Sequence, residues 1–127
     1  MFTSVITSGE VAYWTTKNKI ENIGTVRPKI FLISRDSDTS PINGLSCDLA
    51  KNTNEAELLI IAGSESDHKS IGYYTSILKP LAAKGIQAYC TNPDLVMLTP
   101  NGTSFGAGII AHEYEKMGGL VTWFGKL

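Results

Sequence analysis

Runs of apolar residues alternate along the chain with polar stretches that contain glycine and proline. Residues 29–34 and 57–63 are dominated by isoleucine, leucine and phenylalanine, which is typical of strands buried on both faces of a sheet. Residues 86–90 and 120–124 are shorter runs of the same kind, and residues 95–98 are a further candidate strand. Residues 35–54 are polar and predict a loop with at most a short helical turn.

Two segments repeat apolar residues at helical spacing. The repeat within residues 67–84 predicts an amphipathic helix. Its apolar positions are Ile71, Tyr74, Ile77, Leu78 and Leu81. Pro80 lies near the end of this helix as a candidate kink, and Gly85 is a candidate stop. Residues 107–117 predict a second amphipathic helix, which Gly118 and the glycine after it would end.

The order of these elements indicates the class of fold. A helix over residues 8–19 precedes the first strand, because Thr7 and Glu10 have the spacing of a capping box. Strands and helices then alternate, which is typical of an α/β domain with a mostly parallel sheet. A chain of 127 residues is long enough for one hydrophobic core. We therefore expect residues 1–127 to form a single α/β domain, an open and mostly parallel sheet flanked by helices.

Composition and charge narrow the classes of function. The chain has 11 basic and 12 acidic side chains, a net charge of −1, and no cluster of four or more Lys and Arg. Neither a nucleic acid nor a membrane surface is therefore expected as a partner. The apolar runs are far shorter than the ~20 residues that span a bilayer, and no signal-peptide pattern is present. Cys47 and Cys90 form no metal-binding pair, so we expect a cytoplasmic protein with two idle thiols.

Three short motifs partly match known cofactor-binding or catalytic motifs, and each also has an ordinary structural explanation. Gly106–Ala111 matches the dinucleotide fingerprint, but no acidic residue follows at the distance that binds a ribose. Asp36 and Asp38 follow a buried strand, as the nucleophile and general acid of aspartate-nucleophile phosphatases do. The usual glycine is missing there, and no later acidic pair completes a metal site. His112–Glu113 begins like a zinc-protease motif, but Lys116 stands where the second His is needed.

A more specific signal extends over the second half of the chain. The matching segments are residues 91–94, 106–108, 115–119 and 124–126. Their order and spacing resemble the haloacid dehalogenase superfamily, in particular the subfamily IIA phosphatases related to nitrophenyl-phosphatases, nucleotidases and pyridoxal-phosphatases. Residues 5–10 look like the segment through which those chains enter an inserted cap domain. The resemblance therefore covers the cap, and residues 1–7 and 124–127 resemble its junctions to a catalytic core.

The resemblance implies roles for three residues. The family's aspartate nucleophile, its Ser/Thr motif and its Mg²⁺-binding acidic motif lie outside the cap, so we expect neither a metal site nor a cofactor in this chain. Lys126 matches the family's lysine, which stabilises the charge of the nucleophile and the phosphate, but alone it is expected to have no such function. Asn92 and Asp94 lie in a turn that faces the family's substrate cleft. They are the candidate substrate-binding residues, with a hinge role as the alternative.

One main hypothesis and two alternatives follow. The main hypothesis is a truncated haloacid dehalogenase-like phosphatase that comprises the cap domain and has no catalysis of its own. The first alternative is a non-catalytic module for dimerisation or substrate binding that acts with a separately encoded catalytic core. Its partners are then a second copy or that core, and the family's ligand is a phosphorylated small molecule. The less favoured alternative is a nucleotide-binding domain built on Gly106–Ala111.

Overall fold

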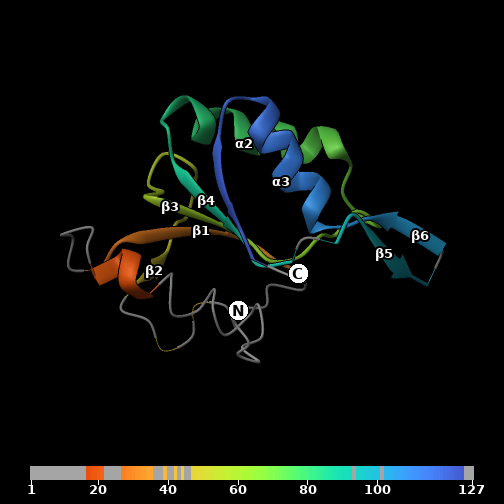
Figure 1. The fold of residues 1–127 in the computed structure, drawn as a ribbon, viewed down its shortest axis with the longest axis horizontal. Coiled ribbons are helices and arrows are strands. Elements are labelled where there is room, and N and C mark those ends of the chain that lie inside the picture. The colour runs from red at the N-terminus through yellow and green to blue at the C-terminus, as the bar shows by residue number, and fades with distance from the viewer. Residues whose placement is uncertain are drawn as a thin grey trace, which may run out of the picture.

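Five parallel strands form the centre of the molecule (Figure 1). The computed structural model describes residues 17–21, 27–35, 39, 42, 44, 47–92, 94–100 and 102–124. Across the sheet the strands follow the order β2 (Asp48–Leu49), β1 (Lys29–Ile33), β3 (Leu58–Ile61), β4 (Gln87–Cys90) and β7 (Leu120–Trp123). Every neighbouring pair is parallel, so the predicted α/β fold with a mostly parallel sheet is confirmed.

Two helices cover one face of this sheet. Helix α2 (Ile71–Ala83) connects β3 to β4, and α3 (Ala107–Lys116) lies between β4 and β7 in chain order. Both lie on the same side of the sheet (Figure 1). Parallel neighbours require such crossovers, because each strand must begin at the same edge as the one before it. The other face is contacted by the helical residues 17–21, of which Ile20 is buried.

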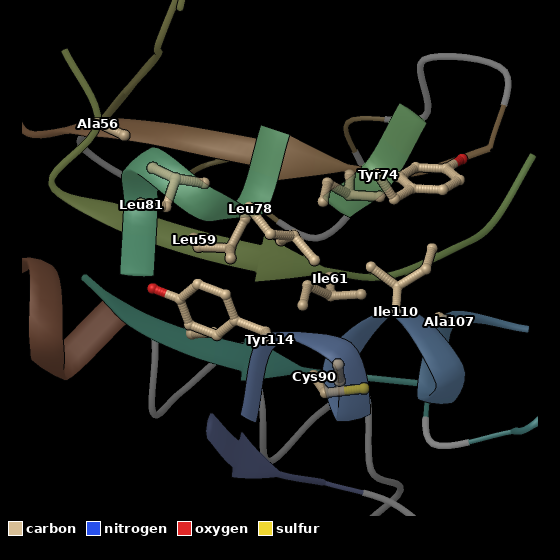
Figure 2. Packing of buried hydrophobic residues seen from close by; sticks show 13 residues of the cluster. Ala56, Leu59, Ile61, Tyr74, Leu78, Leu81, Cys90, Ala107, Ile110 and Tyr114 are labelled. Carbon is tan, nitrogen blue, oxygen red and sulfur yellow. The ribbon is translucent and has the colours of Figure 1, made fainter. Parts of the chain in front are cut away.

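The side chains of β3 are divided between the two faces. Leu59 and Ile61 belong to the core beneath the helices and lie close to Leu78 of α2 (Figure 2). Leu58 and Ile60 belong to a second cluster on the opposite face. Successive side chains of a strand point to opposite faces, and all four are fully buried here. Burial on both sides explains why the whole run is apolar.

The ends of α2 are set by local capping residues. The Ser70 hydroxyl accepts a hydrogen bond from the Tyr73 N–H at 3.2 Å, which satisfies one of the amides that the first turn leaves unpaired. The helix therefore begins at Ile71 rather than at the predicted residue 67. Pro80 lies inside the helix, which continues past it. Gly85 follows the helix with φ +70°, as expected for the residue after a helix end.

A separate antiparallel hairpin consists of β5 (Val96–Thr99) and β6 (Gly102–Phe105). It extends outward from the main sheet (Figure 1). The strand expected near residues 95–98 is therefore present, but it is not a further strand of the main sheet. Its partner β6 was not predicted, because a Gly-Thr-Ser-Phe segment has no clear apolar alternation. Gly102 has φ +117°, a conformation that glycine adopts without steric cost.

The structure also corrects the prediction for residues 35–54, in which no strand is expected from the sequence. They include β2, whose Asp48 and Leu49 pair in parallel with Lys29 and Ile30 of β1. Two residues are too few to produce a periodic pattern, so this strand depends on its neighbour.

No helix in the described part of the chain is long and apolar enough to cross a membrane.

Several predictions fall wholly or partly outside the described residues. Of the helix expected over residues 8–19, only 17–19 are described, and these are helical. Thr7, Asp36, Asp38 and Lys126 are not among the described residues. A single domain over residues 1–127 stays a prediction for the same reason.

Candidate functional site

The carboxyl ends of β1, β3 and β4 lie at one edge of the sheet, because these strands are parallel. Polar residues follow each strand there, namely Ser34 and Arg35 after β1, residues 63–67 after β3, and Thr91 and Asn92 after β4. Open parallel sheets bind ligands at this edge, where the chain reverses its direction across the sheet. The reversal lies at β1, whose neighbours are β2 and β3. We therefore take this edge as the candidate site.

An ion pair with a buried carboxylate and a partly exposed guanidinium joins two of these segments. Arg35 Nη1 and Nη2 donate hydrogen bonds to Asp67 Oδ1 and Oδ2 at 2.8 and 2.7 Å, and Nη1 also donates to the Ser64 carbonyl at 3.0 Å. The Asp67 side chain is only 6% exposed. Its hydrogen bonds to the Arg35 guanidinium lower the pKa of the Asp67 carboxyl to about 2. A carboxylate held at both oxygens by a guanidinium is a specific structural contact.

The Arg35–Asp67 pair makes the stability of the chain depend on acid pH. The pKa of Asp67 is lower in the folded chain than its ordinary value of 3.8. The stabilisation is therefore complete above about pH 4 and is lost as the pH falls toward about 2. Asp67→Asn should lower the urea midpoint of unfolding at pH 7, and its difference from the wild type should shrink between pH 4 and 2.

Asp48→Asn provides a matched control for this measurement. Asp48 also pairs with an arginine, Arg27, at 3.0 Å, but the two side chains are 43% and 53% exposed. Exposed pairs contribute little to stability, so this variant should leave the urea midpoint at pH 7 close to that of the wild type. A midpoint for Asp67→Asn equal to that of the control at every pH would show that the Arg35–Asp67 pair is not stabilising.

The candidate substrate-binding residues Asn92 and Asp94 lie together in the turn after β4. Asn92 Oδ1 accepts a hydrogen bond from the Asp94 N–H at 3.2 Å, and the Asp94 carbonyl accepts one from the Gly108 N–H at 2.9 Å. Asp94 is exposed and Asn92 is half-buried. These hydrogen bonds hold the turn against the start of α3, and a role in substrate binding stays a prediction.

The glycines of the dinucleotide-like motif pack against this same turn. A Cβ on Gly106 would lie 2.4 Å from the Asp94 carbonyl oxygen, so only glycine permits this approach. The N–H groups of Gly106 and Gly108 donate to the carbonyls of Leu95 and Asp94. In a dinucleotide-binding turn the amides at the start of the helix bind the pyrophosphate. Here two of them are already hydrogen-bonded, so packing explains the glycines.

Cys47, Cys90 and His112 each contact other residues of the chain in ways that explain their positions without a catalytic role. Cys47 and Cys90 are free and buried, and burial raises the pKa of the Cys90 thiol to about 11, which keeps it protonated and unreactive at neutral pH. The His112 ring lies 4.7 Å from the Trp123 ring, with its Nδ1 3.4 Å from Glu115. Trp123 Nε1 donates to Glu115 at 3.0 Å.

The described residues do not fit the Mg²⁺ ion that the resemblance implies for the whole family. Mg²⁺ is bound by carboxylates and other oxygen ligands. Two of the carboxylates at the candidate edge, Glu65 and Asp67, are paired with Lys69 and Arg35. Among the residues that the structure describes, no group of three or more His, Cys, Asp or Glu could hold a metal ion.

Among the hollows lined by described residues, one lies beside α2 and another beside α3. The smaller, of about 160 Å³, lies between β1 and α2 and contains the Glu65–Lys69 ion pair beside Tyr73. The larger, of about 540 Å³, lies between Leu95 and α3 and includes Lys116. The charged groups named here are paired within the chain, because Lys116 lies 2.9 Å from Glu113. Neither hollow therefore displays a strong net charge toward a ligand.

The fold matches solved structures of haloacid dehalogenase-like hydrolases. A hydrolase of this family from Brucella suis 1330 matches with a TM-score of 0.75 and 24% sequence identity, over 95% of this chain and 42% of that chain. The p-nitrophenyl phosphatase from Archaeoglobus fulgidus matches with a TM-score of 0.61 and 22% identity, over 88% and 41%. A glycerol phosphate phosphatase from Mycobacterium tuberculosis matches with a TM-score of 0.68 and 13% identity, over 95% and 34%.

The likeness is one of fold, and it covers less than half of each solved structure. No protein-family model and no curated protein matches the sequence. The chain spans between 34% and 42% of the length of the three solved structures. The chain therefore has the fold of one part of the haloacid dehalogenase-like hydrolases, which confirms the resemblance to this superfamily at the level of the fold.

Proposed function

We propose that this chain is the α/β cap of a haloacid dehalogenase-like phosphatase and acts with a catalytic core on a phosphorylated small molecule. The observation that carries the proposal is the coverage of the structural match, which takes in 95% of this chain but 42% of the Brucella suis hydrolase. The segments that resemble the family's cap support the same assignment. The chain's contribution is then to cover and orient the substrate, and the chemistry belongs to the core.

The chemistry of phosphoryl transfer supports this division of roles. Transfer through an aspartyl intermediate needs a carboxylate nucleophile and Mg²⁺ ligands at one place. Of the carboxylates described at the candidate edge, Glu65 and Asp67 are each held in an ion pair, and Asp94 lies in the turn after β4. The Asn92–Asp94 turn and the hairpin that follows it lie at that edge and would face the substrate. A cap of this kind acts by excluding water and by selecting the group that carries the phosphate.

The first test is whether the isolated chain hydrolyses an aryl phosphate in the presence of Mg²⁺. We expect no phosphate release above the buffer level, measured with p-nitrophenyl phosphate. Release that disappears in Asp36→Asn but persists in Asp48→Asn would contradict the proposal. That result would assign an active site to the segment after β1, because Asp36 follows a buried strand whereas Asp48 pairs with Arg27.

A chimera provides the positive half of this test. The full chain replaces the matching part of the Archaeoglobus fulgidus p-nitrophenyl phosphatase, which shares its fold at a TM-score of 0.61. We expect Mg²⁺-dependent turnover with a substrate preference different from that of the parent enzyme. Asp94→Ala in the chimera should raise KM more than it lowers kcat, because the side chain would contact the bound substrate and not the reacting phosphate. A preference identical to that of the parent enzyme would contradict a role in selecting the substrate.

A second function, self-association, is favoured by the exposed apolar side chains of the hairpin. Leu98 is 86% exposed and Val96 61% exposed, although both are large and aliphatic. Sedimentation velocity should detect a dimer that Leu98→Lys dissociates. Leu120→Lys is the matched control, because Leu120 is 60% exposed but begins β7, at the opposite edge of the sheet. A monomer at all protein concentrations would exclude this function.

A further inference from the structure

The loop after β3 is joined to the end of the hairpin by two serine hydroxyls. Ser64 Oγ donates to the Phe105 carbonyl at 2.9 Å, and Ser66 Oγ donates to the same carbonyl at 2.7 Å. Ser64 Oγ also accepts a hydrogen bond from the Ser66 N–H at 3.2 Å. Ser64 is 2% exposed, and no other serine, threonine, amide or charged residue in the described part of the chain is buried to this degree. One carbonyl therefore receives two hydroxyl donors, one from the buried Ser64 and one from the half-buried Ser66.

The loop that carries these serines is itself tied to the sheet and to α2. Arg35, which follows β1, donates to the Ser64 carbonyl at 3.0 Å and binds Asp67 through both carboxylate oxygens. On the helix side, the Tyr74 hydroxyl accepts a hydrogen bond from the Glu65 N–H at 2.9 Å. A Cβ on Gly63 would lie 2.9 Å from the backbone nitrogen of Arg35, so the two segments approach closely. The serines thus project from a rigid base.

The residue that they hold stands at the root of the hairpin. Phe105 is the last residue of β6, and the next residue, Gly106, is the N-cap of α3. The Phe105 ring packs edge-on against Tyr74, with 6.0 Å between ring centroids. At the other root, the Asp94 carbonyl accepts a hydrogen bond from the Gly108 N–H. A two-stranded hairpin is only marginally stable by itself, so its direction depends on these contacts at its base.

We propose that Ser64 and Ser66 are positioning residues, which set the direction of the β5–β6 hairpin and of the Asn92–Asp94 turn relative to the carboxyl edge of the sheet. The significance of that direction rests on the proposed cap function, because the turn and the hairpin would face the substrate. The positioning of the hairpin by Ser64 and Ser66 rests on their hydrogen bonds alone. Both serine hydroxyls donate to the Phe105 carbonyl, so each acts on the turn through that carbonyl and the hairpin.

Spin labels on the full chain test whether the two serines fix the direction of the hairpin. Cysteines introduced by Leu98→Cys and Lys79→Cys, both at exposed positions, place one label on the hairpin and one on α2. Cys47 and Cys90 are buried and should react slowly with the label. We expect one narrow distribution of distances in the wild type and a broad or shifted distribution after Ser64→Ala and Ser66→Ala together. An unchanged distribution would overturn the proposal.

Matched variants separate positioning from a general loss of stability. Thr75 and Ser76 donate their hydroxyls to carbonyls of α2 itself, so Thr75→Ala with Ser76→Ala removes two hydroxyl hydrogen bonds without touching the hairpin. This control should leave the distance distribution unchanged. If the double serine variant does not fold, Ser66→Ala alone supplies the measurement, and Ser66→Thr should restore the wild-type distribution. Broadening in the Thr75 and Ser76 control equal to that of the serine variants would also overturn the proposal.

The phosphatase chimera gives a functional readout. The loss of two neutral hydrogen bonds corresponds to a change of about tenfold or more in the equilibrium between the held and released hairpin. We expect KM to rise by at most that factor, because apparent affinity falls in proportion to the held fraction, with kcat little changed. Failure of the proposed cap function would show as a wild-type chimera without altered substrate preference. Failure of the positioning role would show as normal distances and normal KM in the serine variants of a working chimera.

Discussion

Tyr114→Ala is expected to lower the free energy of unfolding by about 3–5 kcal/mol, the usual range for replacing a buried aromatic side chain with alanine. Tyr114 is fully buried and lies among the apolar side chains between α3 and the sheet (Figure 2). Its ring also lies where a Cβ of Gly119 would be, at 2.4 Å from two ring carbons. A domain is stable by only about 5–15 kcal/mol in total, so the variant should be close to unfolding at room temperature.

Tyr114→Phe separates the ring from its hydroxyl. The hydroxyl donates to the Ile86 carbonyl, and burial raises the pKa of Tyr114 to about 12, so the donor proton is retained at neutral pH. Loss of this one hydrogen bond should cost about 1 kcal/mol. Urea unfolding of both variants, followed by circular dichroism, measures the two contributions. Equal effects of the two substitutions would show that packing of the ring contributes little.

Gly106→Ala is expected to destabilise the chain by about 1–3 kcal/mol, the range for overpacking a close contact. The added Cβ would lie 2.4 Å from the Asp94 oxygen and 3.1 Å from its carbonyl carbon. Both are backbone atoms, so the turn or the helix must move. The hydrogen bond from the Gly108 N–H to the Asp94 carbonyl should weaken with it. Urea unfolding measures the loss, and amide chemical shifts of residues 94 and 95 report the displacement.

Gly72→Ala is the matched control, because it places the same methyl group within α2. The nearest atom to a Cβ there is Ser70 Oγ at 3.7 Å, which is an ordinary contact. Alanine is favoured over glycine in a helix by about 1 kcal/mol, so this substitution should stabilise the chain. Destabilisation by Gly72→Ala similar to that by Gly106→Ala would mean that the contact with Asp94 has no special role. A thermal shift with NAD⁺ that Gly106→Ala abolishes would instead support the nucleotide-binding alternative.

The buried strands were predictable because burial leaves a direct mark on composition. In β3 all four side chains are fully buried, and polar groups placed there would lose their hydrogen bonds to water. The α2 repeat was predictable for a related reason, since Tyr74, Leu78 and Leu81 are its buried positions. The start of α2 was placed too early, because its N-cap depends on the local geometry at Ser70.

Two strands were missed because they depend on a partner more than on their own composition. The two residues of β2 are ordered as a strand by β1. Strand β6 contains Gly102, Thr103, Ser104 and Phe105. These residues form a strand only because they pair with β5. An antiparallel hairpin is indicated in a sequence by its turn and by alternation, and β6 has too few apolar side chains for alternation to be visible.

The candidate site was predicted in part. Asn92 and Asp94 were expected together in one turn, and the hydrogen bond between them places them there. Arg35 and Asp67 were not selected, although both closely follow buried strands. That position was the signal that could have identified them, because the carboxyl ends of parallel strands lie together.

The sequence by itself determines the alternation of buried strands and amphipathic helices, and hence the α/β class. Burial requires only the spacing and composition of apolar side chains, which a local pattern records. Only the tertiary structure decides which polar groups meet at the carboxyl edge. Arg35 and Asp67 are 32 residues apart, and Ser64 is 41 residues from the carbonyl that it holds. Such contacts depend on the order of strands in the sheet and on the direction of the hairpin, which no local pattern encodes.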